Sequence, residues 1–182
     1  MRPVLFLLLS LIPCSAFAIG AQRPRVAVTE AAMLYNRFAN LPGVNWNHAQ
    51  SGCFERARLM TVELDRLDID SVKVFAEDPR GLRVLPDPTD PEWLLTWRYH
   101  VAPAVRGQNG VLLVLDPALL PGPAPVAEWI AALTARPCPQ VTEFERPLSH
   151  RCVWYVAPSS QVHRPRNLGI APDSVLRGLR IQ

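Results

Sequence analysis

The segment that decides the fold is residues 94–117, which read LLTWRYHVAPAVRGQNGVLLVLDP. Residues 94–105 are aromatic, β-branched and apolar, which predicts a strand, and residues 111–115 form a shorter, wholly apolar strand. Between them, Gln108-Asn109-Gly110 is a hairpin turn signal. The two strands are therefore expected to pair antiparallel.

Two polar side chains interrupt this apolar hairpin, one in each arm. His100 lies within the first strand, and Asp116 directly follows the second. An acidic residue at the end of an apolar run is costly to bury unless it has a partner. A turn centred on residues 108 and 109 places position 116 opposite position 101, within reach of His100 given a bulge or a small change of register. We therefore expect Asp116 to orient His100.

The clearest helix precedes the hairpin and is expected to run from Cys53 to Leu67. Its apolar face continues through Ala57, Met60 and Leu64 at helical spacings. Cys53 lies on this face in the first turn, where the helix dipole and free backbone N–H groups favour a thiolate and can hold an oxyanion. A cysteine at a helix start, a histidine and an orienting acid are the parts of a nucleophilic triad.

Shorter segments around these elements complete an α+β pattern, in which a helix is followed by an antiparallel sheet. Further helices are expected at residues 28–39, with Thr29 as a candidate N-cap, and at 126–135. Further strands are expected at residues 71–76, 82–85, 141–144 and 152–157.

The first residues are typical of an export signal. Arg2 is followed by the apolar run Val4–Ile12 and by Ala16-Phe17-Ala18, which has the form of a cleavage site. We expect cleavage after Ala18 and a secreted or periplasmic protein. A lipoprotein, with the lipid on Cys14, is the weaker alternative because it would place a proline where a small residue is needed.

Composition excludes several classes of protein. The chain has 182 residues, of which 49% are hydrophobic, so one domain with a packed core is expected rather than disorder. The formal net charge of +3 is too weak to indicate nucleic-acid binding. No later apolar run reaches the length of a membrane span, so no membrane association is expected once the signal is removed.

The cysteines divide into a pair and a single thiol. Cys138 and Cys152 lie 14 positions apart, and in an oxidising compartment they are good disulfide partners. Closing a loop of this size stabilises a fold by about 3 kcal/mol in the chain-entropy model. Cys53 then remains unpaired, which suits a nucleophile or a small buried residue.

Three longer motifs follow one another in the chain: Gly52-Cys53-Phe54-Glu55-Arg56-Ala57, Trp97-Arg98-Tyr99-His100-Val101-Ala102 and Leu115-Asp116-Pro117-Ala118-Leu119. In this order they closely resemble the motifs of the secreted bacterial protein-glutaminases. The resemblance covers roughly residues 45–135. It implies a papain- or transglutaminase-like core in which the helix with the nucleophile packs on an antiparallel sheet. It also implies Cys53 as nucleophile, His100 as base and Asp116 as orienting acid.

The resemblance further implies deamidation of protein-bound glutamine to glutamate, with no cofactor and a protein or peptide as substrate. A monomer is expected. The chain divides into a signal peptide (1–18), an N-terminal segment (19–44), a catalytic domain (45–160) and a tail (161–182). The alternatives are crosslinking or peptide cleavage by the same triad, and a non-catalytic binding domain at the cell envelope.

The surroundings of the triad are less well specified. Trp46, Trp97 and Tyr99 either line a substrate cleft or belong to the core and its rim. Arg56 and Arg58 are expected on a solvated or polar helix face. The second oxyanion donor stays open, with Gln50, Ser51 and the loop before them as candidates. No metal site is expected, because His48, Cys53 and His100 lack the close spacing of metal ligands.

Overall fold

The computed structural model describes the chain between residues 24 and 160, with gaps. The described ranges are 24–46, 52–82, 84–87, 90–142 and 151–160. The expected signal peptide (1–18) and tail (161–182) lie outside them. Within the described ranges, no helix is long and apolar enough to cross a membrane.

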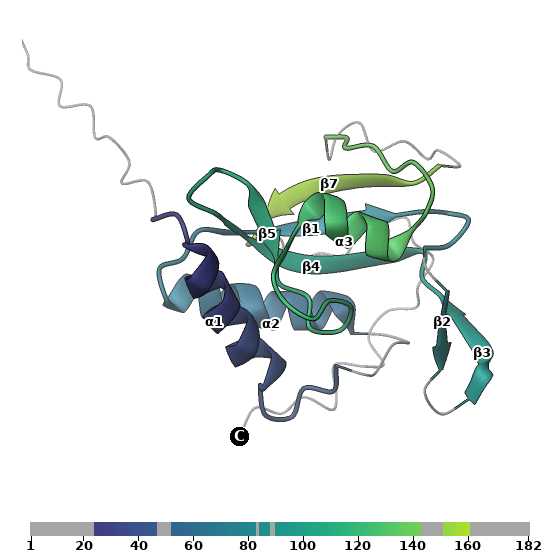
Figure 1. Cartoon of the computed structure of the whole chain (residues 1–182), viewed down its shortest axis with the longest axis horizontal. Coiled ribbons are helices and arrows are strands. Elements are labelled where there is room, and N and C mark those ends of the chain that lie inside the picture. Colours follow the sequence, from purple (N-terminus) through teal and green to yellow (C-terminus); the bar gives the residue numbers. More distant parts are fainter. Residues whose placement is uncertain (1–23, 47–51, 83, 88–89, 143–150, 161–182) are drawn as a thin grey trace, which may run out of the picture.

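A five-stranded antiparallel sheet forms the centre of the fold, with the strand order β6-β5-β4-β1-β7 (Figure 1). Its strands are β1 (Ser71–Glu77), β4 (Tyr99–Arg106), β5 (Leu112–Val114), β6 (Ala124–Pro125) and β7 (Val153–Pro158). The middle strands are the most apolar and the most buried, which is why the core lies on both faces of β1 and β4.

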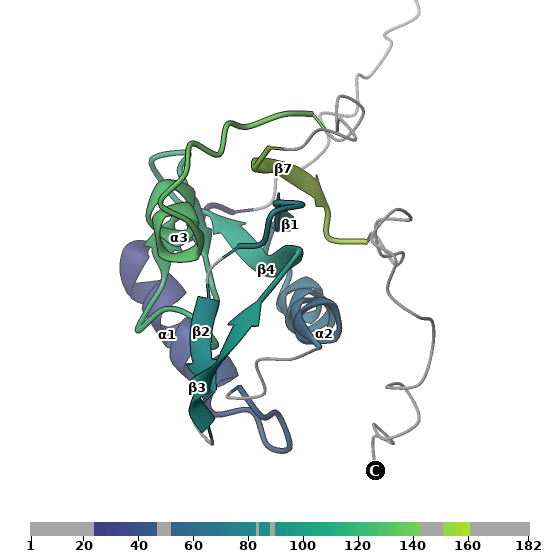
Figure 2. The same ribbon diagram turned by 90° about the vertical axis from the view of Figure 1, so that its right-hand side faces the viewer.

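Three helices pack on this sheet: α1 (Val28–Ala39), α2 (Cys53–Arg66) and α3 (Val126–Leu133). Helices α2 and α3 lie on opposite faces, as Figure 2 shows from the side. Helix α2 buries Phe54 and Ala57 against β1 and β4, whereas α3 buries Trp129 and Leu133 against the other face. The predicted α+β class is therefore confirmed.

Helix α2 begins where the sequence predicts it and ends one residue earlier. Its N-cap is Gly52, whose φ of +89° lies in the left-handed region, which residues with a Cβ disfavour. Met60 and Leu64 are buried as predicted, but Leu67 is 40% exposed because the helix ends before it.

Helix α1 has the predicted bounds, but its predicted cap is wrong. Ala27 is the N-cap residue and makes no side-chain capping bond, so Thr29 already lies inside the first turn. The helix is held by packing instead, with Leu34 and Phe38 buried against Met60 of α2.

The β4–β5 hairpin forms as predicted, with a register that differs by one residue. Ala104 pairs with Val114, so the strands are centred on residue 109 rather than between 108 and 109. The reason is a three-residue loop, closed by a hydrogen bond from the Gly107 N–H to the Val111 carbonyl, in which Gly110 has a φ of +81°.

The predicted strand over residues 94–105 is wrong as a single element. The chain breaks at Trp97-Arg98, and the part before the break forms β3 (Asp90–Thr96), which pairs with β2 (Val84–Asp87) in a separate two-stranded sheet. The backbone carbonyls at the break accept hydrogen bonds from Asp78 and Leu82 instead of continuing a strand ladder.

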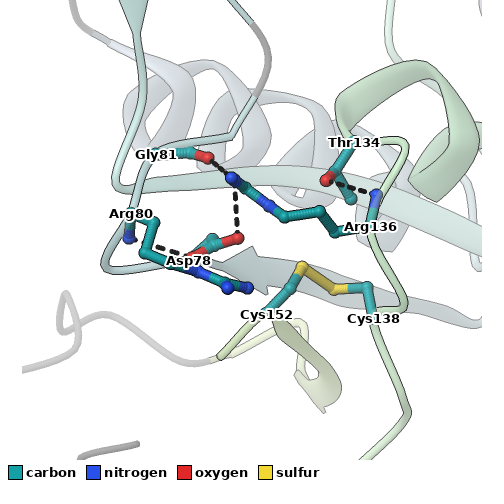
Figure 3. Close-up of a disulfide and its surroundings, with 7 residues drawn as sticks. All are labelled: Asp78, Arg80, Gly81, Thr134, Arg136, Cys138 and Cys152. Atoms are coloured by element: carbon teal, nitrogen blue, oxygen red, sulfur yellow. Dashed lines mark hydrogen bonds and ion pairs between the residues drawn. A yellow bond between two sulfur atoms is a disulfide. The ribbon is translucent and has the colours of Figure 1, made fainter. Parts of the chain in front are cut away.

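The segment after α3 is fastened to the sheet by a covalent bond and an ion pair. Cys138 and Cys152 form the predicted disulfide, and Arg136 reaches both the Asp78 carboxylate and the Gly81 carbonyl (Figure 3). The strand predicted at 141–144 does not form in its described part, residues 141 and 142, where the Val141 N–H bonds to the Trp154 carbonyl beside an isolated bridge at Gln140. Residues 143 and 144 lie outside the described residues.

Candidate active site

His100 and Asp116 form a buried pair at the start of β4 and just after β5. The His100 Nε2 atom lies 2.7 Å from Asp116 Oδ2, and the two residues are 3% and 4% exposed. The predicted contact between them is therefore present. The contact forms because the hairpin returns the chain alongside β4. The pairing continues past Ala104 and Val114, since the Leu115 N–H bonds to the Pro103 carbonyl.

The Asp116 carboxylate accepts hydrogen bonds through both oxygens. Oδ2 accepts from the Trp129 Nε1–H at 2.8 Å as well as from His100, and Oδ1 accepts from the Ala118 N–H at 3.2 Å. A buried carboxylate needs such donors, because burial without them destabilises its charge. Helix α3 therefore holds Asp116 from the side opposite the hairpin.

The His100 ring is packed between aromatic neighbours and has one nitrogen left for a second partner. Its centroid lies 4.9 Å from that of Trp97 and 5.8 Å from that of Trp129, both in stacked arrangements. Because Asp116 engages Nε2, Nδ1 is the nitrogen that remains for Cys53, which lines the same cavity and contributes to raising the pKa of His100. The ring thus lies between a carboxylate and a thiol.

The charges of this pair stabilise each other. Burial lowers the pKa of His100, but the Asp116 carboxylate and the hydrogen bonds to Asp116 and Cys53 outweigh it and raise the pKa to about 10. Burial likewise raises the pKa of Asp116, but the His100 charge and the bonds from Trp129 and Ala118 outweigh it and lower the pKa. An imidazolium facing a carboxylate is therefore the state at neutral pH.

A small cavity opens beside the pair and includes the nucleophile candidate. The cavity is lined by Trp46, Cys53, Arg56, Ala57, Met60, His100, Val101, Ala102, Pro103, Leu115 and Asp116.

Arg56 and Trp46 form one wall of this cavity. Arg56 is half-buried, and its guanidinium carbon lies 5.9 Å from the centroid of the Trp46 ring. The side chain folds back over Gly52, where an added Cβ would meet Arg56 Nη1 at 3.2 Å.

The three aromatic residues considered for a substrate cleft have different surroundings. Trp46 lines the cavity. Trp97 stacks on His100 and packs against the α3 side of the core. Tyr99 is 8% exposed and packs with Phe54 and Tyr155. Of the three, only Trp46 therefore borders the cavity that contains Cys53.

Comparison with known proteins connects this geometry to a family. The model of a family described as Glutaminase matches residues 31–133, which is more than half of the chain and includes Cys53, His100 and Asp116. The chain belongs to the protein-glutaminase family. A comparison with curated proteins found no match.

Solved protein-glutaminase structures have the same fold. The NMR structure of protein-glutaminase from Chryseobacterium proteolyticum is 20% identical, with a TM-score of 0.56 over 84% of this chain and 82% of that one. A crystal structure of protein-glutaminase is also 20% identical, with a TM-score of 0.52 over 73% of this chain and 72% of that one. Membership of the protein-glutaminase family implies a hydrolase of that type.

Two residues of this protein-glutaminase fold that support Asp116 were missed by sequence reasoning. Trp129 donates to its carboxylate, and the Tyr35 hydroxyl of α1 bonds to the Leu120 carbonyl in the turn that begins at Asp116. The turn itself is closed by the Leu119 and Leu120 N–H groups, which bond to the Asp116 carbonyl. The available signal was the buried acid itself, which requires donors such as an indole N–H.

Raising the pH should remove the stabilisation that His100 supplies to this member of the protein-glutaminase family. The pKa of His100 is raised from 6.5 to about 10 on folding. Its contribution to the free energy of unfolding is therefore complete below about pH 6.5 and is lost as the pH rises toward and through about 10. Urea unfolding of the parent and of His100→Gln should show a stability difference that shrinks over this range. A difference independent of pH would mean that His100 is uncharged in the folded protein.

Proposed function

We propose that this protein is a cysteine-dependent amide hydrolase that deamidates protein-bound glutamine to glutamate and releases ammonia. The observation that carries the proposal is the cavity in which Cys53, at the start of α2, meets the His100–Asp116 pair. A nucleophile with a base, and a base with an orienting acid, are the arrangement that covalent acyl transfer requires.

The proposed reaction has two halves. The Cys53 thiolate adds to the carboxamide carbon, and the electron pair of the C=O bond moves onto the oxygen. The tetrahedral intermediate collapses as the C–N bond breaks, and the His100 imidazolium protonates the leaving nitrogen to give ammonia. Water, deprotonated by His100, then attacks the thioester and releases glutamate and Cys53. Asp116 holds the His100 tautomer and stabilises its charged form through both steps.

The position of the nucleophile in a small cavity supports a side-chain amide as the substrate group. A glutamine side chain is narrow and flexible, whereas a main-chain peptide bond brings two chain segments with it. A protein or peptide with an accessible glutamine is therefore the proposed partner.

The proposed location is outside the cytoplasm. The Cys138–Cys152 disulfide supports it, because such bonds persist in oxidising compartments. The expected signal peptide, residues 1–18, supplies the route of export.

Ammonia release from casein tests the proposal. Incubation with the parent protein should release ammonia and convert glutamine to glutamate at the same sites in equal amount, as measured by an ammonia assay and by mass spectrometry of casein peptides. Free glutamine, assayed beside it, separates a protein substrate from the free amino acid. The Cys53→Ala variant is the matched control for contaminating activity.

The same experiment distinguishes the rival activities. Shortened casein chains would indicate a peptidase, and covalent casein oligomers would indicate transglutaminase-like transfer to lysine. Unchanged casein and unchanged free glutamine would contradict the proposed function and favour a non-catalytic binding domain.

A further inference from the structure

An oxyanion formed in this cavity needs a second hydrogen-bond donor besides the backbone. The Cys53 N–H belongs to the first turn of α2, where N–H groups have no partner within the helix. Effective oxyanion sites combine such a group with at least one further donor aimed at the same oxygen. Gln50 and Ser51, the candidates closest in sequence, lie outside the described residues.

Trp46 carries a donor with no use in the fold. Its Nε1 atom is buried and has no hydrogen-bond partner among the described residues, although the ring lines the same cavity as Cys53 and His100. Buried N–H groups without a partner are rare, because each loses its bonds to water and gains nothing in return. An unpaired donor next to a nucleophile indicates that its acceptor comes with the substrate.

The surroundings of Trp46 suit this use. Arg56 lies over the face of the ring, and its own position depends on the missing Cβ of Gly52. The guanidinium therefore covers one face of the indole and adds positive charge to the wall of the cavity without occupying Nε1. An indole N–H can only donate, so it stabilises an oxyanion and cannot compete with His100 as a base.

We infer that Trp46 Nε1–H is the second oxyanion donor of the site, acting with the Cys53 backbone N–H on the tetrahedral intermediate. The inference rests on the proposed function in one respect, which is that the physiological substrate is a glutamine carboxamide. The oxygen that it binds is the former carboxamide oxygen, which carries the electron pair of the broken π bond until the C–N bond breaks and the C=O bond re-forms.

Two reactions of Cys53 separate this role from a general structural one. Acylation by p-nitrophenyl acetate forms a C–S bond, passes through an oxyanion and expels p-nitrophenolate. Alkylation by iodoacetamide forms a C–S bond by displacing iodide at a CH₂ carbon, so it forms no oxyanion. Both need the same nucleophile, and neither needs recognition of glutamine.

The test compares the parent with Trp46→Phe, which keeps an aromatic face for Arg56 and removes only the N–H. We expect acylation to slow by about 10²-fold, as for loss of one oxyanion donor, while alkylation changes by less than about twofold. Trp154→Phe on β7, an indole that does not line the cavity, is the matched control and should change neither rate.

The outcomes are distinct. Unchanged acylation in Trp46→Phe would overturn the inference. An equal fall in the rates of acylation and alkylation would also overturn it, because Trp46 would then act only by positioning Cys53 or His100. Failure of the parent to release ammonia from casein would overturn the proposed function instead, while the ratio of acylation to alkylation would still report on Trp46.

Discussion

Replacement of Cys53 by alanine should abolish ammonia release while the protein stays folded. Cys53 supplies the only free thiol among the described residues, and no other side chain there that lines the cavity can form the covalent intermediate. Its side chain is only partly buried and packs at the edge of a core cluster, so truncation leaves a small gap rather than a large cavity. Thermal unfolding should therefore change far less than activity.

A second measurement shows whether Cys53 is activated. Because Cys53 begins α2 and shares its cavity with His100, the thiol should react with iodoacetamide faster than a free cysteine does. His100→Gln should remove that advantage. Substantial deamidation by Cys53→Ala would refute the proposed nucleophile, and equal alkylation rates with and without His100 would refute its activation.

Replacement of Asp116 by asparagine should lower kcat by up to about 10⁴-fold, by analogy with the same change in serine proteases. The hydrogen bonds explain why no orientation of the amide is satisfactory. If its oxygen faces His100 and Trp129, its NH₂ group faces the Ala118 N–H, and the reverse orientation presents NH₂ to both rings. In the first orientation the negative charge of the carboxylate is lost. In the second that charge is lost and the favoured tautomer of His100 changes as well.

The pH dependence of Asp116→Asn distinguishes a lost charge from a damaged fold. Without the carboxylate, the main cause that raises the pKa of His100 is gone, so the alkaline limit of activity should move to lower pH. Asp78→Asn is a matched control, because Asp78 is equally buried but pairs with Arg136 beside the disulfide. It should lose stability without that shift. Activity of Asp116→Asn equal to that of the parent would mean that another group orients His100.

The elements that could be predicted from the sequence are those with a strong local signal. The periodic apolar face defined α2, the turn residues defined the β4–β5 hairpin, and the polar residues at its ends predicted the contact of His100 with Asp116. Each of these depends on residues close together in the sequence or joined by a tight turn.

The features that could not be predicted depend on distant contacts. The break between β3 and β4 is set by hydrogen bonds from Asp78 and Leu82, whereas the residues on both sides of it favour a strand equally. Trp129 reaches Asp116 only after a proline-rich connection and a change of direction into α3, so no spacing marks the pair. Likewise, the missing partner of the Trp46 indole N–H becomes apparent only in the folded structure, where the buried polar atoms of the described residues can be matched with their partners.

The short loop closed by Cys138 and Cys152 bears on how the protein acquires its disulfide. Cys53, Cys138 and Cys152 are the three thiols after the expected signal peptide, and they could form three different pairs. Cys53 lies 85 and 99 positions before the other two, whereas those two are 14 positions apart. Loop closure by an unfolded chain weakens as the −3/2 power of loop length, which favours the local pair by roughly 15-fold. Oxidative folding thus tends to consume the two distal thiols with each other and to leave the nucleophile reduced.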